Sequence, residues 1–133
     1  MAWGVALGCR DSYEAPAPVL TLLPAALHAR GAAALVDGQG LCLGAGATAE
    51  ATIYVHERTV TMTITAHRRR GATSMLRTRL GALDVATEPV RASEATEFTY
   101  RTASDRGDQT LRLSVPAESA GEVCVEQVAL TQP

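Results

Sequence analysis

The sequence predicts an all-β fold, a two-sheet antiparallel β-sandwich or jelly roll. From residue 33 onward, short apolar or alternating segments recur roughly every ten residues, and clusters of Gly, Pro, Asp and Arg separate them. Aromatic residues make up only 4% of the 133 residues, so the core must be built from Ala, Val, Leu, Ile and Met. A chain of this length is large enough to bury such a core as one domain.

The first part of the chain does not share this pattern. We interpret residues 1–18 as a linker or a trimmed signal, and residues 19–133 as the sandwich domain. Cys9 follows a small residue, as in a bacterial lipoprotein signal, and is expected to be lipidated, free or intermolecular. In the stretch 19–29, "VLTLLPAALHA", Pro24 excludes a long helix and leaves a short helix or an edge strand. No run reaches the roughly 18 apolar residues of a membrane span.

Alternation places the side chains of the middle strands. "AALV" ends at the turn "DGQG" (37–40), which "LCL" follows. In "EATIYVHE" the residues Ala51, Ile53 and Val55 share one face, so Tyr54 is expected to be exposed on the other. "TVTMTITAH" (59–67) alternates most regularly, with Val, Met, Ile and Ala directed inward and four threonines directed outward.

The later strands follow the same pattern. "SMLRTRLGALDVAT" (74–87) predicts a strand, a turn at Gly81 and a second short strand. "TEFTYRT" (96–102) places Phe98 and Tyr100 on one face. "SDRGDQ" reads as a hairpin loop, "TLRLSVP" (110–116) as the next strand and "GEVCVEQVAL" (121–130) as the closing one. The total is eight or nine strands.

Composition excludes several classes of function. The formal net charge is −2, so we expect no nucleic-acid partner. No nucleophile elbow, P-loop, dinucleotide fingerprint or supported pair of catalytic acids occurs, and the chain is therefore not expected to be an enzyme. No Cys or His spacing of zinc type is present.

The segments "TVTMTITAHRRRG", "MLRTRLG", "TEFTYRTASDRGDQTLRLSV" and "VCVEQVAL" occur in this order. This succession resembles the β-sandwich carbohydrate-binding modules of bacterial polysaccharide-degrading enzymes, over about residues 33–130. These are galactose-binding-like jelly rolls that include xylan-binding and calcium-dependent modules. The resemblance implies a secreted protein of the extracellular space or cell envelope that targets an attached enzyme to a polysaccharide. Calcium is a cofactor that the resemblance allows, and otherwise none is expected.

Two kinds of side chain are candidates for holding a glycan. Tyr54 and Tyr100 are candidates for stacking on a sugar ring, whereas Phe98, which shares a strand face with Tyr100, fits the core better in a domain with so few aromatic residues. Arg68, Arg69 and Arg70 form the densest positive cluster, which either holds the acidic groups of a uronic or sulfated polysaccharide or is a solvated loop.

The closing strand carries the remaining candidates. Glu126 interrupts its alternation as a β-bulge would, and it either turns toward a ligand or Ca²⁺, or faces solvent or an Arg. Cys42 and Cys124 lie near the two ends of the sandwich sequence, and first and last strands are often neighbours in jelly rolls. They form either a disulfide or two buried free thiols.

The leading functional hypothesis is therefore a non-catalytic, carbohydrate-binding β-sandwich that binds polysaccharide. The alternative is a structural or protein-interaction sandwich, such as a lipoprotein or assembly domain, with no sugar site. An exposed aromatic ring together with convergent polar groups on a hollowed face would favour the first hypothesis, and a smooth surface of Thr and Arg the second.

Overall fold

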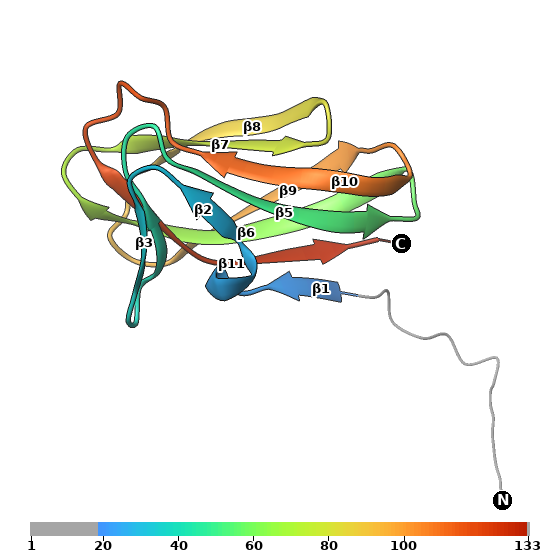
Figure 1. Cartoon of the computed structure of the whole chain (residues 1–133), viewed down its shortest axis with the longest axis horizontal. Coiled ribbons are helices and arrows are strands. Elements are labelled where there is room, and N and C mark those ends of the chain that lie inside the picture. Colours follow the sequence, from blue (N-terminus) through green and yellow to red (C-terminus); the bar gives the residue numbers. More distant parts are fainter. Residues whose placement is uncertain (1–18, 133) are drawn as a thin grey trace, which may run out of the picture.

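The computed structural model describes residues 19–132 and contains two antiparallel sheets packed face to face (Figure 1). The six-stranded sheet has the order β3-β4-β11-β6-β9, with β1 also paired to β11, and the five-stranded sheet has the order β2-β5-β10-β7-β8. The elements are β1 (Val19–Leu22), the 3-10 helix η1 (Pro24–Ala26), β2 (His28–Arg30), β3 (Ala33–Val36), β4 (Gly40–Leu43), β5 (Thr48–Val55), β6 (Thr59–Arg70), β7 (Ser74–Leu80), β8 (Leu83–Val90), β9 (Thr96–Ala103), β10 (Gly107–Ser114) and β11 (Glu122–Thr131). The predicted all-β sandwich is confirmed.

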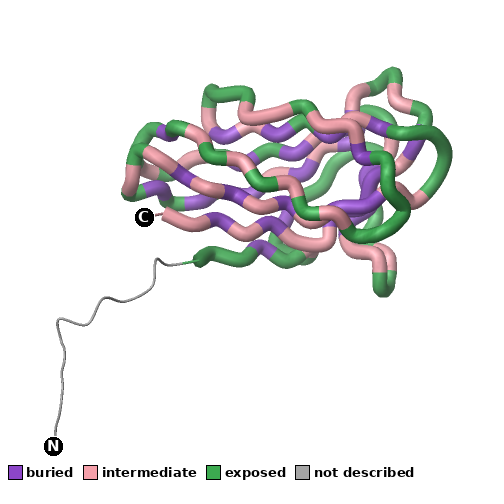
Figure 2. Tube along the Cα trace, turned by 180° about the vertical axis from the view of Figure 1, so that it is seen from behind, coloured by how far each residue is buried: buried purple, intermediate pink, exposed green. Residues whose placement is uncertain are grey.

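Alternation in each strand builds the core between the sheets, and Figure 2 shows buried and more exposed positions following each other along the strands. The inward side chains of β6 are buried, whereas the four threonines that alternate with them are half-buried. Within residues 19–132 the buried apolar core contains no aromatic residue, and Phe98 and Tyr100 pack partly buried against it. The expectation of an aliphatic core is therefore correct.

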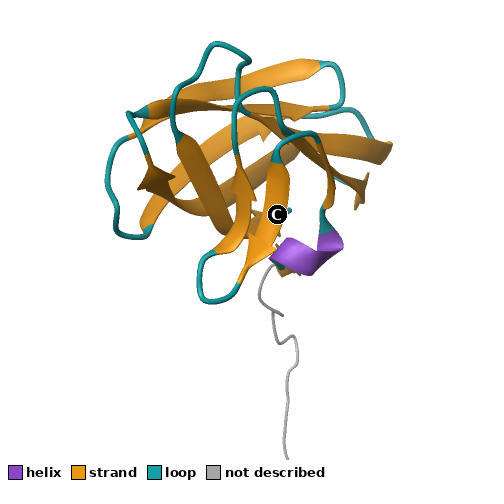
Figure 3. Cartoon of the chain, turned by 60° about the vertical axis from the view of Figure 1, so that its left-hand side comes forward, coloured by secondary structure: helices purple, strands orange, loops and turns teal. Residues whose placement is uncertain are grey.

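The last strand is central rather than peripheral. β11 pairs with β6 along its length, with β4 through its first half, and with β1 through its second half. The early and late parts of the chain are thus neighbours, as the jelly-roll expectation requires. Figure 3 shows the short helix η1 beside the strands at this end of the sandwich.

The strand count was underestimated, because residues 19–132 contain eleven strands. The stretch 19–29 forms β1, η1 and the start of β2, so it contains both of the predicted alternatives, with Pro24 opening the helix. The predicted hairpin loop is also shorter, since β10 already begins at Gly107. Gly107 has a φ of 101°, a conformation that glycine adopts readily. Because glycine is typical of turns, the sequence does not indicate that the strand begins at this residue.

Residues 1–18, which include Cys9 and the predicted lead-in, lie outside the described part. Among residues 19–132 no helix is long and apolar enough to cross a membrane.

Candidate functional site

The outer face of the five-stranded sheet presents a hollowed polar surface. Its side chains come from alternate positions of β5, β10 and β7, whose other positions point into the core. Strand register brings them into rows: Thr48 lies opposite Ser114, which lies opposite Arg77, which in turn lies opposite Thr87 on β8. The next row contains Glu50, Arg112, Arg79 and Asp84 in the same order of strands.

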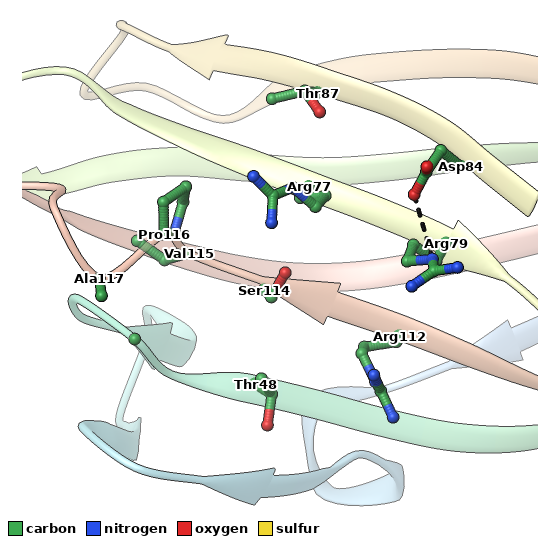
Figure 4. Close-up of a pocket in the computed structure, with 11 residues that line it drawn as sticks. Thr48, Arg77, Arg79, Asp84, Thr87, Arg112, Ser114, Val115, Pro116 and Ala117 are labelled. Carbon is green, nitrogen blue, oxygen red and sulfur yellow. Dashed lines mark ion pairs between the residues drawn. The ribbon is translucent and has the colours of Figure 1, made fainter.

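Apart from Glu50, the residues of these two rows line a hollow of about 660 Å³ (Figure 4), which we call the sheet-face groove. Its floor is polar, and the loop after β10 contributes Val115, Pro116 and Ala117 to one end. The polar lining consists of Thr48, Arg77, Arg79, Asp84, Thr87, Arg112 and Ser114. Hydroxyl and guanidinium groups from four adjacent strands thus converge on one space.

Two of the three arginines in the groove have acidic partners. The Nε atom of Arg79 lies 3.0 Å from Oδ1 of Asp84, an ion pair that lacks the alignment of a hydrogen bond. Nε of Arg112 donates to Oε2 of Glu50 at 2.5 Å. Exposed ion pairs of this kind contribute only about 0.2–1 kcal/mol, so a ligand that offers equivalent oxygens can replace them at small cost.

The third arginine differs from the other two. Arg77 is exposed, and within residues 19–132 its side chain has no acidic partner within 4.0 Å. Its cross-strand neighbours, Ser114 and Thr87, carry hydroxyl groups. Figure 4 shows its guanidinium group extending over the groove toward Ser114 and Pro116.

Smaller hollows continue the groove along the same face. One of about 90 Å³ shares Arg79 and Arg112 with it, and another of about 220 Å³ is lined by Glu50, Thr52 and Thr110. Tyr54 follows Thr52 on the same face of β5 and is 63% exposed, as its place in the alternation predicts. The face therefore combines a groove, a row of hydroxyl groups and one exposed aromatic ring.

The end of the chain holds Tyr54 in place. The side-chain amide of Gln132 donates from Nε2 to the carbonyl oxygen of Tyr54 at 3.0 Å. Its Oε1 accepts from the backbone N–H groups of His56 at 2.8 Å and Glu57 at 3.2 Å. The ring of Tyr54 also stacks on the ring of His56, with centroids 6.5 Å apart. These contacts restrict the motion of the strand end that carries Tyr54.

The second predicted tyrosine faces the interior of the sandwich. The ring of Tyr100 packs against the core, and its hydroxyl donates to Oε1 of Glu88 at 2.8 Å. Since Tyr100 is on β9 and Glu88 on β8, this bond joins the edge strands of the two sheets. Burial, reinforced by the hydrogen bond and the charge of Glu88, raises the pKa of Tyr100 well above its ordinary value.

The predicted arginine cluster lies on the six-stranded sheet, away from the groove. Nε of Arg68 donates to the carbonyl oxygen of Arg91 at 2.9 Å, and its Nη1 donates to that of Gly71 at 2.7 Å. Nη1 of Arg69 lies 2.7 Å from Oε1 of Glu122. Arg70 is exposed at the end of β6. The structure therefore does not bring these arginines together with Tyr54.

The β-bulge expected at Glu126 is present. The register between β11 and β6 shifts between Val125 and Gln127, which leaves Glu126 as the extra residue. Its Oε2 lies 2.8 Å from Nδ1 of His67, whose Nε2 lies 2.6 Å from Oε1 of Gln39. The partner of this carboxylate is thus a buried histidine rather than an arginine, and the side chain of Glu126 remains 35% exposed to solvent.

Cys42 and Cys124 form a disulfide between β4 and β11, where the two residues lie directly opposite each other. The alternative of two free thiols is thereby excluded. Together with Glu122 they form the one group of three metal-ligand side chains found among residues 19–132. Both sulfur atoms are consumed by the bridge and Glu122 pairs with Arg69, so this group does not fit calcium, which takes six to eight oxygen ligands.

Sequence reasoning missed the groove arginines, although their strands were correctly identified. In "SMLRTRL" and "TLRLSV" the alternation alone directs Arg77, Arg79 and Arg112 outward. What the pattern does not contain is the order β5-β10-β7, which brings strands more than 20 residues apart in the chain side by side.

Comparison with known proteins supports the fold. No protein-family model and no curated protein sequence matches the chain. Among solved structures, a CBM36 domain of a multidomain xylanase from the hindgut metagenome of Trinervitermes trinervoides superposes with a TM-score of 0.79 at 16% identity. That match covers 87% of this chain and 98% of the other.

Two further structures extend the comparison. A CBM36 module in complex with calcium and xylotriose has a TM-score of 0.75 at 15% identity, covering 84% of this chain and 99% of the module. A GH26-CBM35 β-(1,4)-mannanase from Podospora anserina has a TM-score of 0.67 at 13% identity, covering 86% of this chain and 28% of the enzyme. The chain therefore has the β-sandwich fold of carbohydrate-binding modules, as the succession of its strands predicts.

Proposed function

We propose that this chain is a non-catalytic carbohydrate-binding module that holds a polysaccharide on the outer face of its five-stranded sheet. The observation that carries the proposal is the sheet-face groove, where hydroxyl and guanidinium groups converge on one space of about 660 Å³. Hollows with a few convergent polar groups are the usual form of small-molecule and sugar sites. These side chains match the hydroxyl groups of sugars, because a guanidinium group donates several hydrogen bonds at once and the Ser and Thr hydroxyls both donate and accept.

An extended polymer fits this face better than a small sugar does. Thr48, in the groove, and Tyr54 lie six positions apart on one strand, which corresponds to about 20 Å. The smaller hollows connect these two points along the sheet. A chain that runs parallel to β5 would form hydrogen bonds with the groove and stack one ring on Tyr54. We assign this stacking the value known for pairs of aromatic side chains, about 0.5–1.5 kcal/mol beyond the area that is buried.

The same observations favour binding over a purely structural role. The outer face of β6 presents a regular row of half-buried threonines, which is the surface expected of a structural sandwich. The five-stranded sheet instead combines the groove with an exposed aromatic residue.

We propose a narrower set of binding residues than the sequence suggests. Tyr54 remains the aromatic platform, and Arg70 is exposed on the other sheet, where it would contact only a ligand that wraps around the edge. Structural roles are proposed for the four candidates that have internal partners, namely Arg68, Arg69, Tyr100 and Glu126.

We further propose that binding needs no calcium. Glu126, the carboxylate that the sequence suggested for Ca²⁺, is paired with His67, and Glu122, the carboxylate of the one metal-ligand group in the described residues, is paired with Arg69. In the groove, guanidinium groups supply the positive charge that a cation would otherwise provide.

Location and partners follow from the proposed role. A structural disulfide is typical of an oxidising compartment, which supports the extracellular space or cell envelope. The superposed CBM36 domain belongs to a multidomain xylanase, and the superposed mannanase contains its module within a longer chain. An attached catalytic domain is therefore the proposed partner besides the polysaccharide.

Affinity electrophoresis tests this function with native gels that contain xylan, mannan, β-glucan or pectin, each run with calcium and with a chelator. We expect at least one polymer to retard the protein equally under both conditions. Tyr54→Ala should weaken that binding about 2- to 13-fold, the equivalent of the stacking energy. Leu35→Ala is the matched control, because it removes an exposed apolar side chain from the other sheet.

Retardation by none of the polymers would contradict the proposed function. Retardation that disappears with the chelator would refute only the claim of calcium independence. Unchanged affinity in Tyr54→Ala would refute only the role of Tyr54.

A further inference from the structure

Three arginines stand close together on the groove floor, an arrangement that costs stability. Arg79 and Arg112 are direct cross-strand partners, and like charges directly opposite each other are destabilising. Arg77 precedes Arg79 by two positions and therefore lies on the same face of β7. Asp84 and Glu50 at the two flanks offset the first two charges. Nothing among the described residues offsets the third in the same way.

The surroundings of Arg77 consist of hydroxyl groups rather than carboxylates. Its row runs from Thr48 through Ser114 and Arg77 to Thr87, across four adjacent strands and about 14 Å. The chain as a whole has a formal net charge of −2, so this positive point is not part of a generally basic surface. An unpaired guanidinium among hydroxyl donors is complementary to an oxyanion.

The acidic neighbours define the rest of the ligand. Asp84, at the rim of the groove, accepts hydrogen bonds but repels a second anion placed beside it. The subsite around Arg77 therefore suits one charged group, with sugar hydroxyls on either side of it. A polymer that carries acidic groups at intervals meets this requirement.

We propose that Arg77, with the hydroxyl groups of Ser114 and Thr87, forms an anion subsite in the sheet-face groove, and that the preferred ligand is an acidic polysaccharide. The recognised group is an oxyanion attached to a sugar, either the carboxylate of a uronic acid or a sulfate ester. The planar guanidinium fork presents two parallel N–H donors to two oxygens of such a group, which an ammonium does not. This inference depends on the proposed function, since it names the ligand class of the same groove.

Two pairs of polymers separate the two sources of the anion. Glucuronoxylan is compared with its carboxyl-reduced form, and dextran sulfate with unmodified dextran, by isothermal titration calorimetry at physiological salt. We expect one acidic polymer to bind at least about tenfold more tightly than its neutral counterpart. In Arg77→Gln that preference should disappear, because the affinity for the acidic polymer should fall much more than the affinity for its neutral counterpart. Arg77→Lys should restore only part of it, because charge alone lacks the paired geometry.

Arg101→Gln is the matched control, since Arg101 is an exposed arginine on β9 of the other sheet. Loss of the acidic preference in that variant would mean diffuse electrostatic attraction and would overturn the subsite. An unchanged preference in Arg77→Gln, or equal binding of acidic and neutral polymers by the unmodified protein, would overturn it too. In the last case the proposed function would survive, because a neutral polymer binds. Circular dichroism and a denaturant midpoint confirm that each variant is folded.

Discussion

Tyr100 shows how a residue that looks like a binding platform instead closes the sandwich. Its strand face is shared with Phe98, and both rings pack against the core, so the pairing that suggested a sugar site is a packing arrangement. The hydroxyl then needs an acceptor because it is withdrawn from water, and Glu88 of the opposite sheet supplies one. A partner from another sheet is invisible in a linear sequence, although the sequence did predict the strand and the face that Phe98 and Tyr100 share.

This bond should make stability depend on pH in the alkaline range. The pKa of Tyr100 is raised on folding, so its contribution is complete below the unfolded value of about 10. Above that pH the unfolded chain releases the phenolic proton and the folded one retains it. The free energy of unfolding should therefore fall with rising pH until the folded pKa is reached, and solvent screening of this partly exposed group keeps the slope below the limit of about 1.4 kcal/mol per pH unit. Denaturant titrations from pH 8 to 11.5 measure this slope.

Tyr100→Phe should abolish most of that slope, whereas Tyr54→Phe should leave it intact, because Tyr54 is exposed in the folded state. Absorbance of tyrosinate near 295 nm provides a second measurement, with one tyrosine of the folded protein ionising late. An unchanged slope in Tyr100→Phe would mean that other groups cause the alkaline loss.

Strand β11 illustrates how one extra residue organises a polar cluster. The bulge at Glu126 directs its carboxylate to His67, which Gln39 contacts from the turn before β4. Gly40 follows in that turn with a φ of 99°, and any Cβ there would collide with the carbonyl oxygen of Val125 beside the bulge. The interrupted alternation in the sequence predicted the bulge. It did not identify His67 as the partner, because β6 and β11 are separated by more than 50 residues in the sequence although they are neighbours in the sheet.

Removal of the Glu126 carboxylate should therefore affect stability rather than binding. Glu126→Ala leaves the buried ring nitrogen of His67 without its partner, and we expect a loss of about 1–3 kcal/mol in the free energy of unfolding. Glu126→Gln keeps a hydrogen-bonding group at this position and should lose less. Chemical denaturation measures both values, and calorimetry with the polymer that binds the unmodified protein measures affinity.

Glu118→Ala is a suitable control, because Glu118 is an exposed acid in the loop that precedes the same strand. A loss of glycan affinity in Glu126→Ala with unchanged stability would restore the original ligand role of this residue.

At the scale of the whole molecule, the fold was predictable because alternation is a local signal, whereas the site was not. The alternation within one strand shows that the side chain of Arg77 points outward. Its proposed role in binding, however, depends on Ser114 and Thr87, which lie beside it only because of the strand register. The candidates that sequence favoured were residues conspicuous in the chain: a run of arginines, a few aromatics and a lone acid. The folded chain pairs most of these internally and builds its groove from side chains spread over four strands.

The disulfide acts at this largest scale. It joins residues 82 positions apart, so it links β4 to the central strand β11 and restricts most of the unfolded chain. Loops of this length lie at the upper end of the stabilisation attributed to chain entropy, and we expect reduction to lower the free energy of unfolding by about 2–4 kcal/mol.

Both cysteines are at most 1% exposed, so reduction should require denaturant together with the reductant. A Cys9→Ser background removes the third thiol from the measurement. Denaturant midpoints of the oxidised and the reduced, refolded protein give the difference, and mass spectrometry after alkylation counts the thiols. Equal midpoints, or two alkylated cysteines in protein that was never reduced, would show that the bridge does not stabilise this sandwich.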